Sequence, residues 1–161
     1  MVSHPENWIQ DFAKAGASSI TFHLEASQDP LSLVSVIHSY GMKAGIALKP
    51  DTPWTLIEPF LQSLDMVLIM SVEPGFGGQS FMESSLLKIS KLRELAGEFL
   101  HIQVDGGIGL QNIDKVRTAN PSCEFFFWGV RRKGTVQVSD HFILSIYSQG
   151  DRGRGQCYCS R

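Results

Sequence analysis

The sequence has few cysteines, no long apolar run and no excess of positive charge. Three cysteines, Cys123, Cys157 and Cys159, are too few for a disulfide framework, so we expect a reducing compartment and predict a cytoplasmic protein. The apolar stretches are far shorter than the roughly 20 residues that span a membrane. Because the net charge is −2, no global basic field points to nucleic acid. Residues 1–5 also lack the charged start and apolar segment of a signal peptide.

The sequence does have enough apolar residues for a core. Hydrophobic residues make up 43% of its 161 positions, which suits one ordinary domain or part of a larger one. Segments rich in β-branched residues alternate with helical stripes, and this alternation predicts an α/β fold with a parallel sheet. We predict strands over 18–24, 44–48, 66–71, 101–104 and 124–130, and helices over 7–14, 31–40, 55–64, 82–95 and 111–118.

Alternation alone leaves two architectures open. A (β/α)₈ barrel and a doubly wound sheet both place ligands at the carboxyl ends of their strands. A closed barrel needs eight strands, whereas this sequence offers five. Pro59 falls inside the helix expected over 55–64, and it is expected to kink or delay that helix.

A glycine-rich segment, 72–81, lies between the apolar run 66–70 and the helix expected from Met82. Gly75, Gly77 and Gly78 bring bare backbone close to a ligand, because glycine has no side chain to hold it away. We interpret the segment as a cradle or cover for a phosphate. The alternative is a tight turn with no ligand.

A carboxylate stands at the tip of the next expected strand. Asp105 comes directly before Gly106 and Gly107. As in the segment 72–81, an expected strand is therefore followed by glycines that leave the backbone bare. Such a carboxylate is a candidate acid or base at the edge where α/β proteins bind ligands. The alternative is that Asp105 only caps the following turn.

Four segments carry a specific resemblance, and they are 21–26, 41–50, 70–82 and 104–107. In wording, order and spacing they resemble ribulose-phosphate 3-epimerase, and the resemblance extends from Met1 to about residue 118. It implies a (β/α)₈ TIM barrel of the ribulose-phosphate-binding type that interconverts ribulose 5-phosphate and xylulose 5-phosphate. It also implies a divalent metal, zinc, iron, manganese or cobalt, that stabilises the enediolate formed when the C3 proton leaves.

The resemblance assigns roles residue by residue. Asp105 matches an aspartate that is both a catalytic acid/base and a metal ligand. The remaining matches are to residues that bind the substrate, a pentose 5-phosphate. Met70 matches a residue that lines the site near the metal, and Gly75, Phe76, Gly77 and Gly78 match the loop that covers the substrate. Gly106 and Gly107 match backbone that contacts the phosphate.

The chain also departs from the pattern, so we expect an incomplete barrel. The resemblance implies two histidines and a second aspartate in segments that precede the match to Met1, leaving Asp105 as one ligand of four. We therefore expect a partial barrel domain over 1–130, and a divergent, poorly ordered tail over 131–161 that reflects an altered reading frame or an alternative exon. A barrel without its first strands exposes two sheet edges, and inversion lacks its second acid/base group.

These departures favour weak or no activity for the chain alone. The alternative function is a non-catalytic truncated isoform that binds sugar phosphate or pairs with a full-length subunit. The resemblance also implies a homodimer as an alternative assembly. A different phosphate-binding barrel, such as an isomerase of amino-acid biosynthesis, is disfavoured by the wording of 72–82. His23 is expected to be a buried strand histidine, and 157–159 a solvated tail segment rather than a metal site.

Overall fold

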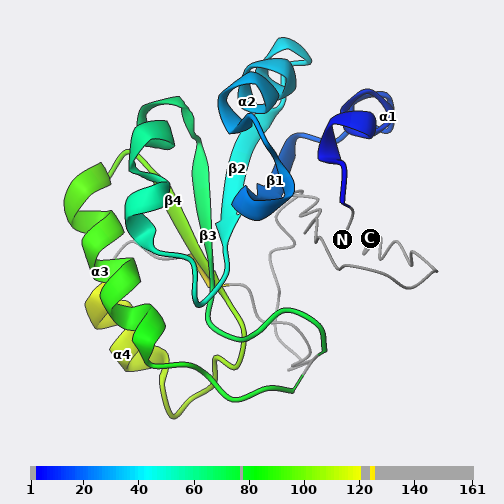
Figure 1. The fold of residues 1–161 in the computed structure, drawn as a ribbon. Coiled ribbons are helices and arrows are strands. Elements are labelled where there is room, and N and C mark those ends of the chain that lie inside the picture. Colours follow the sequence, from blue (N-terminus) through cyan, green and yellow to red (C-terminus); the bar gives the residue numbers. More distant parts are fainter. Residues whose placement is uncertain (1–2, 77, 121–123, 126–161) are drawn as a thin grey trace.

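The fold is a parallel sheet with helices between successive strands (Figure 1). The computed structural model describes residues 3–76, 78–120 and 124–125, so Gly77, the three cysteines and the expected tail over 131–161 lie outside the described residues. The strands are β1 (Ser19–His23), β2 (Lys43–Leu48), β3 (Met66–Met70), β4 (His101–Asp105) and β5 (Glu124–Phe125).

The helices follow the strands in alternation, as the sequence predicts. They are α1 (Ile9–Lys14), α2 (Pro30–Ser39), α3 (Ser84–Ala96) and α4 (Ile113–Ala119), with short 3-10 helices η1 (Pro5–Asn7), η2 (Leu24–Ala26), η3 (Trp54–Leu56) and η4 (Glu58–Ser63). In the described part of the chain, no helix combines the length and apolar character needed to cross a membrane.

One predicted helix is wrong. Residues 55–64 form η3 and η4 instead of an α-helix. Pro59 lies in the first turn of η4, where its missing N–H is tolerated, but its ring would clash with the carbonyl four residues earlier in a continuous α-helix. The helix expected from Met82 begins two residues later, at Ser84.

The strand order separates the two architectures that the sequence leaves open. Every pair is parallel, and the order is β1-β2-β3-β4-β5, so each described strand neighbours the next one along the chain. A doubly wound sheet reverses its order at a switch point, whereas a (β/α)₈ barrel adds its strands in sequence. The described part is therefore consistent with a partial (β/α)₈ barrel.

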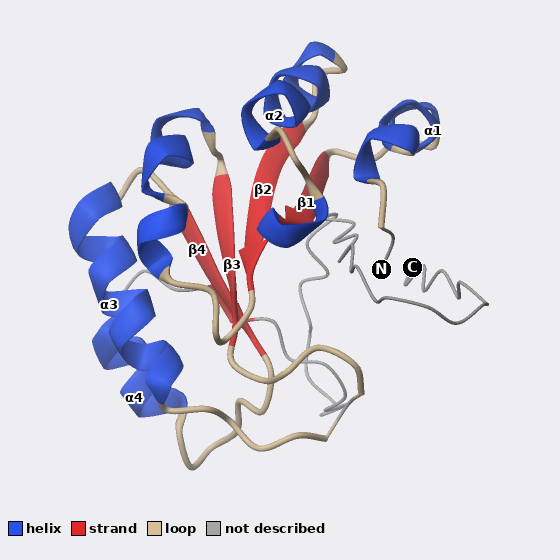
Figure 2. Ribbon diagram, in the orientation of Figure 1, coloured by secondary structure: helices blue, strands red, loops and turns tan. Residues whose placement is uncertain are grey.

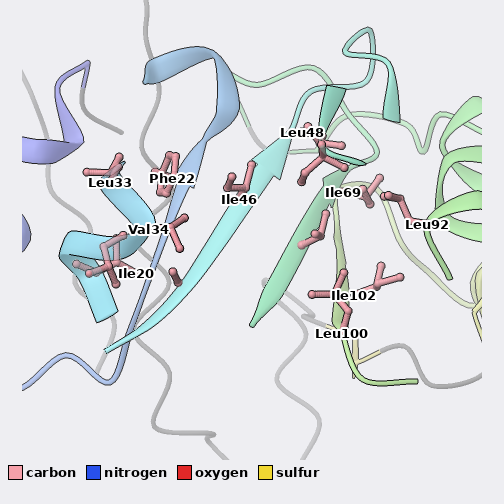
Figure 3. Close-up of a cluster of buried hydrophobic side chains, with 14 of the residues drawn as sticks. Ile20, Phe22, Leu33, Val34, Ile46, Leu48, Ile69, Leu92, Leu100 and Ile102 are labelled. Carbon is pink, nitrogen blue, oxygen red and sulfur yellow. The ribbon is translucent and has the colours of Figure 1, made fainter. Parts of the chain in front are cut away.

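A single apolar core joins the helices to one face of the sheet. Ile20 and Phe22 of β1 lie on this face, and Figure 3 shows them near Leu33 and Val34 of α2. On the opposite face, a smaller buried cluster comprises Ala47, Leu68, Met70 and Val72. Side chains therefore alternate along each strand between a helix-facing core and an inner face.

Parallel pairing brings the loops that follow β3 and β4 to the same edge of the sheet. Met66 pairs with His101 at one end of the two strands and Met70 with Asp105 at the other. Figure 2 shows the long loops after β3 and β4 at a common end of the strands. The glycine-rich segment and the Asp105 turn therefore meet at this edge.

Candidate functional site at the carboxyl ends of β3 and β4

Asp105 is the last residue of β4, and its register partner is Met70, the last residue of β3. The Asp105 side chain is partly buried, and burial raises the pKa of its carboxyl above the usual range. Within the described ranges, no side chain or backbone N–H bonds to this carboxylate. A carboxyl with a raised pKa and no fixed partner is suited to accept and return a proton.

The turn after Asp105 is built on two glycines with positive φ. Gly106 has φ +119° and Gly107 has φ +62°, a conformation that costs side-chain-bearing residues energy. A Cβ on Gly106 would stand 2.4 Å from Val72 Cγ2, and a Cβ on Gly107 would stand 2.4 Å from the Phe81 nitrogen. The turn therefore packs directly on both ends of the glycine-rich loop.

The glycine-rich loop over 72–81 is closed at its base. The Met82 N–H donates to the Ser71 carbonyl at 2.8 Å, across the two ends of the loop. Inside the loop, the Gln79 amide donates to the carbonyl of Phe76 at 2.9 Å and to that of Glu73. Gly75 and Gly78 also have positive φ, and the Phe76 side chain is 76% exposed near the tip.

The structure therefore brings four of the expected site residues together. Met70 lies beside Asp105 on the inner face, while Gly106 and Gly107 contact the ends of the loop. Gly75, Phe76 and Gly78 lie farther out along that loop, on the solvent side.

The expected metal site was tested against the ligands present. Among residues 3–76, 78–120 and 124–125, no group of three or more His, Cys, Asp or Glu side chains could hold a metal ion. A tight divalent site needs at least three protein ligands. Asp105 alone does not supply them, so the described residues do not fit a bound metal.

A partly exposed network, anchored by the buried His23, lies at the carboxyl ends of β1 and β2. His23 is buried, as expected, and its Nδ1 lies 3.5 Å from a Glu25 carboxylate oxygen. The Thr52 hydroxyl donates to the other Glu25 oxygen. Burial alone would raise the pKa of Glu25, but the hydrogen bonds from His23 and Thr52 outweigh it and lower that pKa to about 2.

Lys88 of α3 extends this network to the loop after β2. Its ammonium donates to the carbonyls of Lys49, Pro50 and Thr52, at 2.7, 2.9 and 2.6 Å. An ammonium has three protons, so these bonds use all of its donors. Lys88 is therefore a loop anchor.

Sequence reasoning missed Ser71, Glu25 and Lys88. Ser71 is fully buried, and its hydroxyl lies 3.0 Å from the Asp105 carbonyl and 2.7 Å from the Gly106 carbonyl. The signal that could have found it is a small hydroxyl residue placed between an apolar strand and a glycine-rich loop. Glu25 and Lys88 gave no such signal, because Thr52 lies 27 positions from Glu25 and the carbonyls that Lys88 binds lie 36–39 positions from it.

Comparison with known proteins places the chain among relatives of one kind. The ribulose-phosphate 3 epimerase family model matches residues 1–126. The chain is 52% identical over 115 residues to the ribulose-phosphate 3-epimerase of Candida glabrata, covering 70% of this chain and 46% of that protein. It is 47% identical over 119 residues to the Schizosaccharomyces pombe protein of the same name, covering 74% and 52%.

A plant protein is also similar. The ribulose-phosphate 3-epimerase, cytoplasmic isoform, of Oryza sativa is 41% identical over 127 residues, covering 76% of this chain and 55% of that protein. The chain thus spans about half the length of the curated relatives it matches. The family match covers every strand and helix described above, including the Asp105 turn and the glycine-rich loop. The chain belongs to the ribulose-phosphate 3-epimerase family.

Proposed function

We propose that the edge formed by β3 and β4 is the substrate edge of an enzyme that interconverts ribulose 5-phosphate and xylulose 5-phosphate. Asp105 is the acid/base group that exchanges the C3 proton on one face of the sugar. Family membership supports the reaction. The observation that carries the proposal is the partly buried Asp105 carboxyl, with its raised pKa, on the strand that leads into two glycines.

The phosphate end of the substrate would lie against backbone rather than side chains. Gly106 and Gly107 leave the turn bare, and the loop that carries Gly75 and Gly78 stands next to it. Bare backbone lets N–H groups approach a phosphate closely. Met70 and Phe76 would contact the carbon chain of the sugar, and Gly77 belongs to the same covering loop.

We further propose that the 161-residue chain alone turns over little or no substrate. Inversion at C3 needs proton exchange on both faces, and Asp105 is the one residue of this chain to which the family resemblance assigns that role. The described residues also hold no set of metal ligands. The second function consistent with this is a non-catalytic cytoplasmic isoform that binds pentose phosphate, or that pairs with a second copy or a full-length subunit.

The direct test is an epimerase assay in D₂O on the purified 161-residue protein, with the Candida glabrata relative as the positive control. Proton NMR follows both epimerisation and deuterium uptake at C3. The proposal predicts that the relative turns over and the chain alone does not. Turnover by the chain alone at a rate near that of the relative would refute the proposed inactivity. Pairing is tested by adding full-length subunit and measuring mass in solution.

A further inference from the structure

Ser71 binds the backbone on both sides of Gly106. Its own N–H donates to the Asp105 carbonyl at 2.8 Å, and its hydroxyl lies within hydrogen-bond distance of the carbonyls of Asp105 and Gly106. A serine hydroxyl has one proton, so the two carbonyls share this donor. Because Ser71 is fully buried, water does not compete for these bonds.

Regular strand geometry ends within this stretch of backbone. On the β3 side the register runs as far as the pair Met70 and Asp105, and the Ser71 N–H continues it to the Asp105 carbonyl. Beyond Asp105, the positive φ values of Gly106 and Gly107 end that geometry. The carbonyls of Gly106 and Gly107 take side-chain donors in its place.

Two side chains supply those donors from opposite sides of the turn. Ser71 holds the carbonyls of Asp105 and Gly106, and the Asn112 amide donates to the Gly107 carbonyl at 3.0 Å. Asn112 also accepts from the Gly109 N–H at 2.8 Å, which closes the far end of the turn. Three successive carbonyls are thereby fixed in direction.

We propose that Ser71 is a positioning residue, which fixes the peptide after Asp105 and so orients both the Asp105 carboxylate and the glycine turn at the substrate edge. The proposal rests on the proposed role of Asp105 in proton exchange. It goes beyond that role by naming the group that keeps the carboxylate in place. Ser71 itself does not touch substrate; it acts through the backbone of Asp105 and Gly106.

The test compares three substitutions of Ser71 with a matched one elsewhere. Ser71→Ala removes the hydroxyl, Ser71→Cys keeps the volume with a weak donor, and Ser71→Thr keeps the hydroxyl. The control is Ser85→Ala, because Ser85 is equally buried and its hydroxyl donates to a backbone carbonyl, that of Met82, at 2.7 Å. The readouts are the backbone amide chemical shifts of Asp105, Gly106 and Gly107 and the exchange rates of the Gly106 and Gly107 amides.

Loss of one buried hydrogen bond corresponds to about a tenfold change in a local opening equilibrium. We expect Ser71→Ala and Ser71→Cys to speed exchange at Gly106 and Gly107 by about tenfold and to shift the amide resonances of Asp105, Gly106 and Gly107, because the peptide after Asp105 loses its fixed direction. Ser71→Thr is expected to retain the parent values, and Ser85→Ala to leave these resonances and exchange rates unchanged.

Three results would overturn the proposal. Folded Ser71→Ala and Ser71→Cys proteins with parental exchange rates and chemical shifts would show that the hydroxyl positions nothing. An equal effect of Ser85→Ala would reduce the role to general packing. Failure of both the alanine and the cysteine variants to fold would make Ser71 a stability residue instead. None of these readouts needs turnover, so the epimerase assay tests the proposed function separately, and either proposal can fail while the other stands.

Discussion

Gly107 lies directly against the backbone of Phe81, so that a Cβ on Gly107 would stand 2.4 Å from the Phe81 nitrogen and 2.8 Å from the Gln79 carbonyl oxygen. These are backbone atoms, which cannot swing aside as the end of a side chain can. The turn after β4 and the end of the glycine-rich loop are therefore one packed unit, and each limits the shape of the other.

A methyl group at this contact is expected to be costly. Gly107→Ala must pay the strain of a positive φ and also displace the loop, so we expect it to lower the free energy of unfolding by about 2–4 kcal/mol. The control is Gly41→Ala, because Gly41 has φ +75° and nothing within 4 Å of the added Cβ. It should cost about 1–2 kcal/mol, from the left-handed conformation alone. Urea unfolding measures both, and equal losses would contradict the packed unit.

Asp105→Asn is expected to stabilise the fold while removing the proposed acid/base group. Burial raises the pKa of the Asp105 carboxyl, so the ionised form destabilises the folded state above that pKa and the penalty disappears as pH falls through it. A neutral amide should therefore raise the free energy of unfolding by about 0.5–2 kcal/mol near pH 7. The gain should shrink toward acid pH.

The matched variant for this comparison is Asp114→Asn. Asp114 is exposed in the first turn of α4, where a negative charge favours the helix, so its loss should cost about 0.3–1 kcal/mol. Denaturant melts across the pH range distinguish the two. A destabilised Asp105→Asn at neutral pH would mean that the carboxylate has a stabilising partner.

Glu25→Gln tests the network at the carboxyl ends of β1 and β2. Hydrogen bonds from His23 and Thr52 lower the pKa of Glu25 from 4.5 to about 2 against the effect of burial. The stabilisation from the carboxylate is therefore complete above pH 4.5 and is lost as pH falls from there toward 2. We expect the substitution to cost about 1.5 kcal/mol near neutral pH, at the low end for bonds to a charged group because Glu25 is partly exposed.

In Glu25→Gln, the free energy of unfolding should fall less steeply with decreasing pH than in the parent protein. Unfolding measured between roughly pH 6 and pH 2.5 tests this. Glu94→Gln is the control, since Glu94 is an exposed carboxylate that pairs with Lys91 at 2.8 Å. An acid limb unchanged from the parent in Glu25→Gln would contradict the network.

Lys88→Met should destabilise the loop after β2. The substitution keeps the apolar stem but leaves the carbonyls of Lys49, Pro50 and Thr52 without their common donor. A buried group left unsatisfied costs about 1–3 kcal/mol, and these residues are half-buried, so we expect a total loss of about 2–3 kcal/mol. Lys91→Met on the exposed side of α3 should cost at most about 1 kcal/mol. Similar losses for the two, measured by thermal unfolding, would show that the anchor is not needed.

The sequence was sufficient for the elements whose pattern is local. The run Met66–Met70 is apolar and bounded by turn residues, and it forms β3 where expected. Residues 55–64 have an apolar content compatible with a helix, yet Pro59 and the packing of the loop favour two 3-10 turns. The local sequence pattern does not distinguish an α-helix from two 3-10 turns here, because tertiary contacts decide between them.

The candidate site divides in the same way. Asp105, Gly106 and Gly107 could be predicted because strand-end carboxylates and paired glycines are visible in one short segment. The position of Ser71 between a strand and a glycine-rich loop is visible in the sequence, but its role is not, because that role depends on carbonyls 34 and 35 positions later. The raised pKa of Asp105 depends on burial, which only the folded chain defines.

The most direct test of the central claim is a chimera in which residues 1–120 replace the matching stretch of the Candida glabrata relative. The rest of the chimera comes from the relative, so its activity reports whether residues 1–120 of this chain can form their part of the active site. We predict that it interconverts ribulose 5-phosphate and xylulose 5-phosphate, and that Asp105→Asn in the chimera lowers kcat by about 10²–10⁴-fold, as expected for loss of an acid/base group. An active chimera that keeps its kcat after Asp105→Asn would contradict the account.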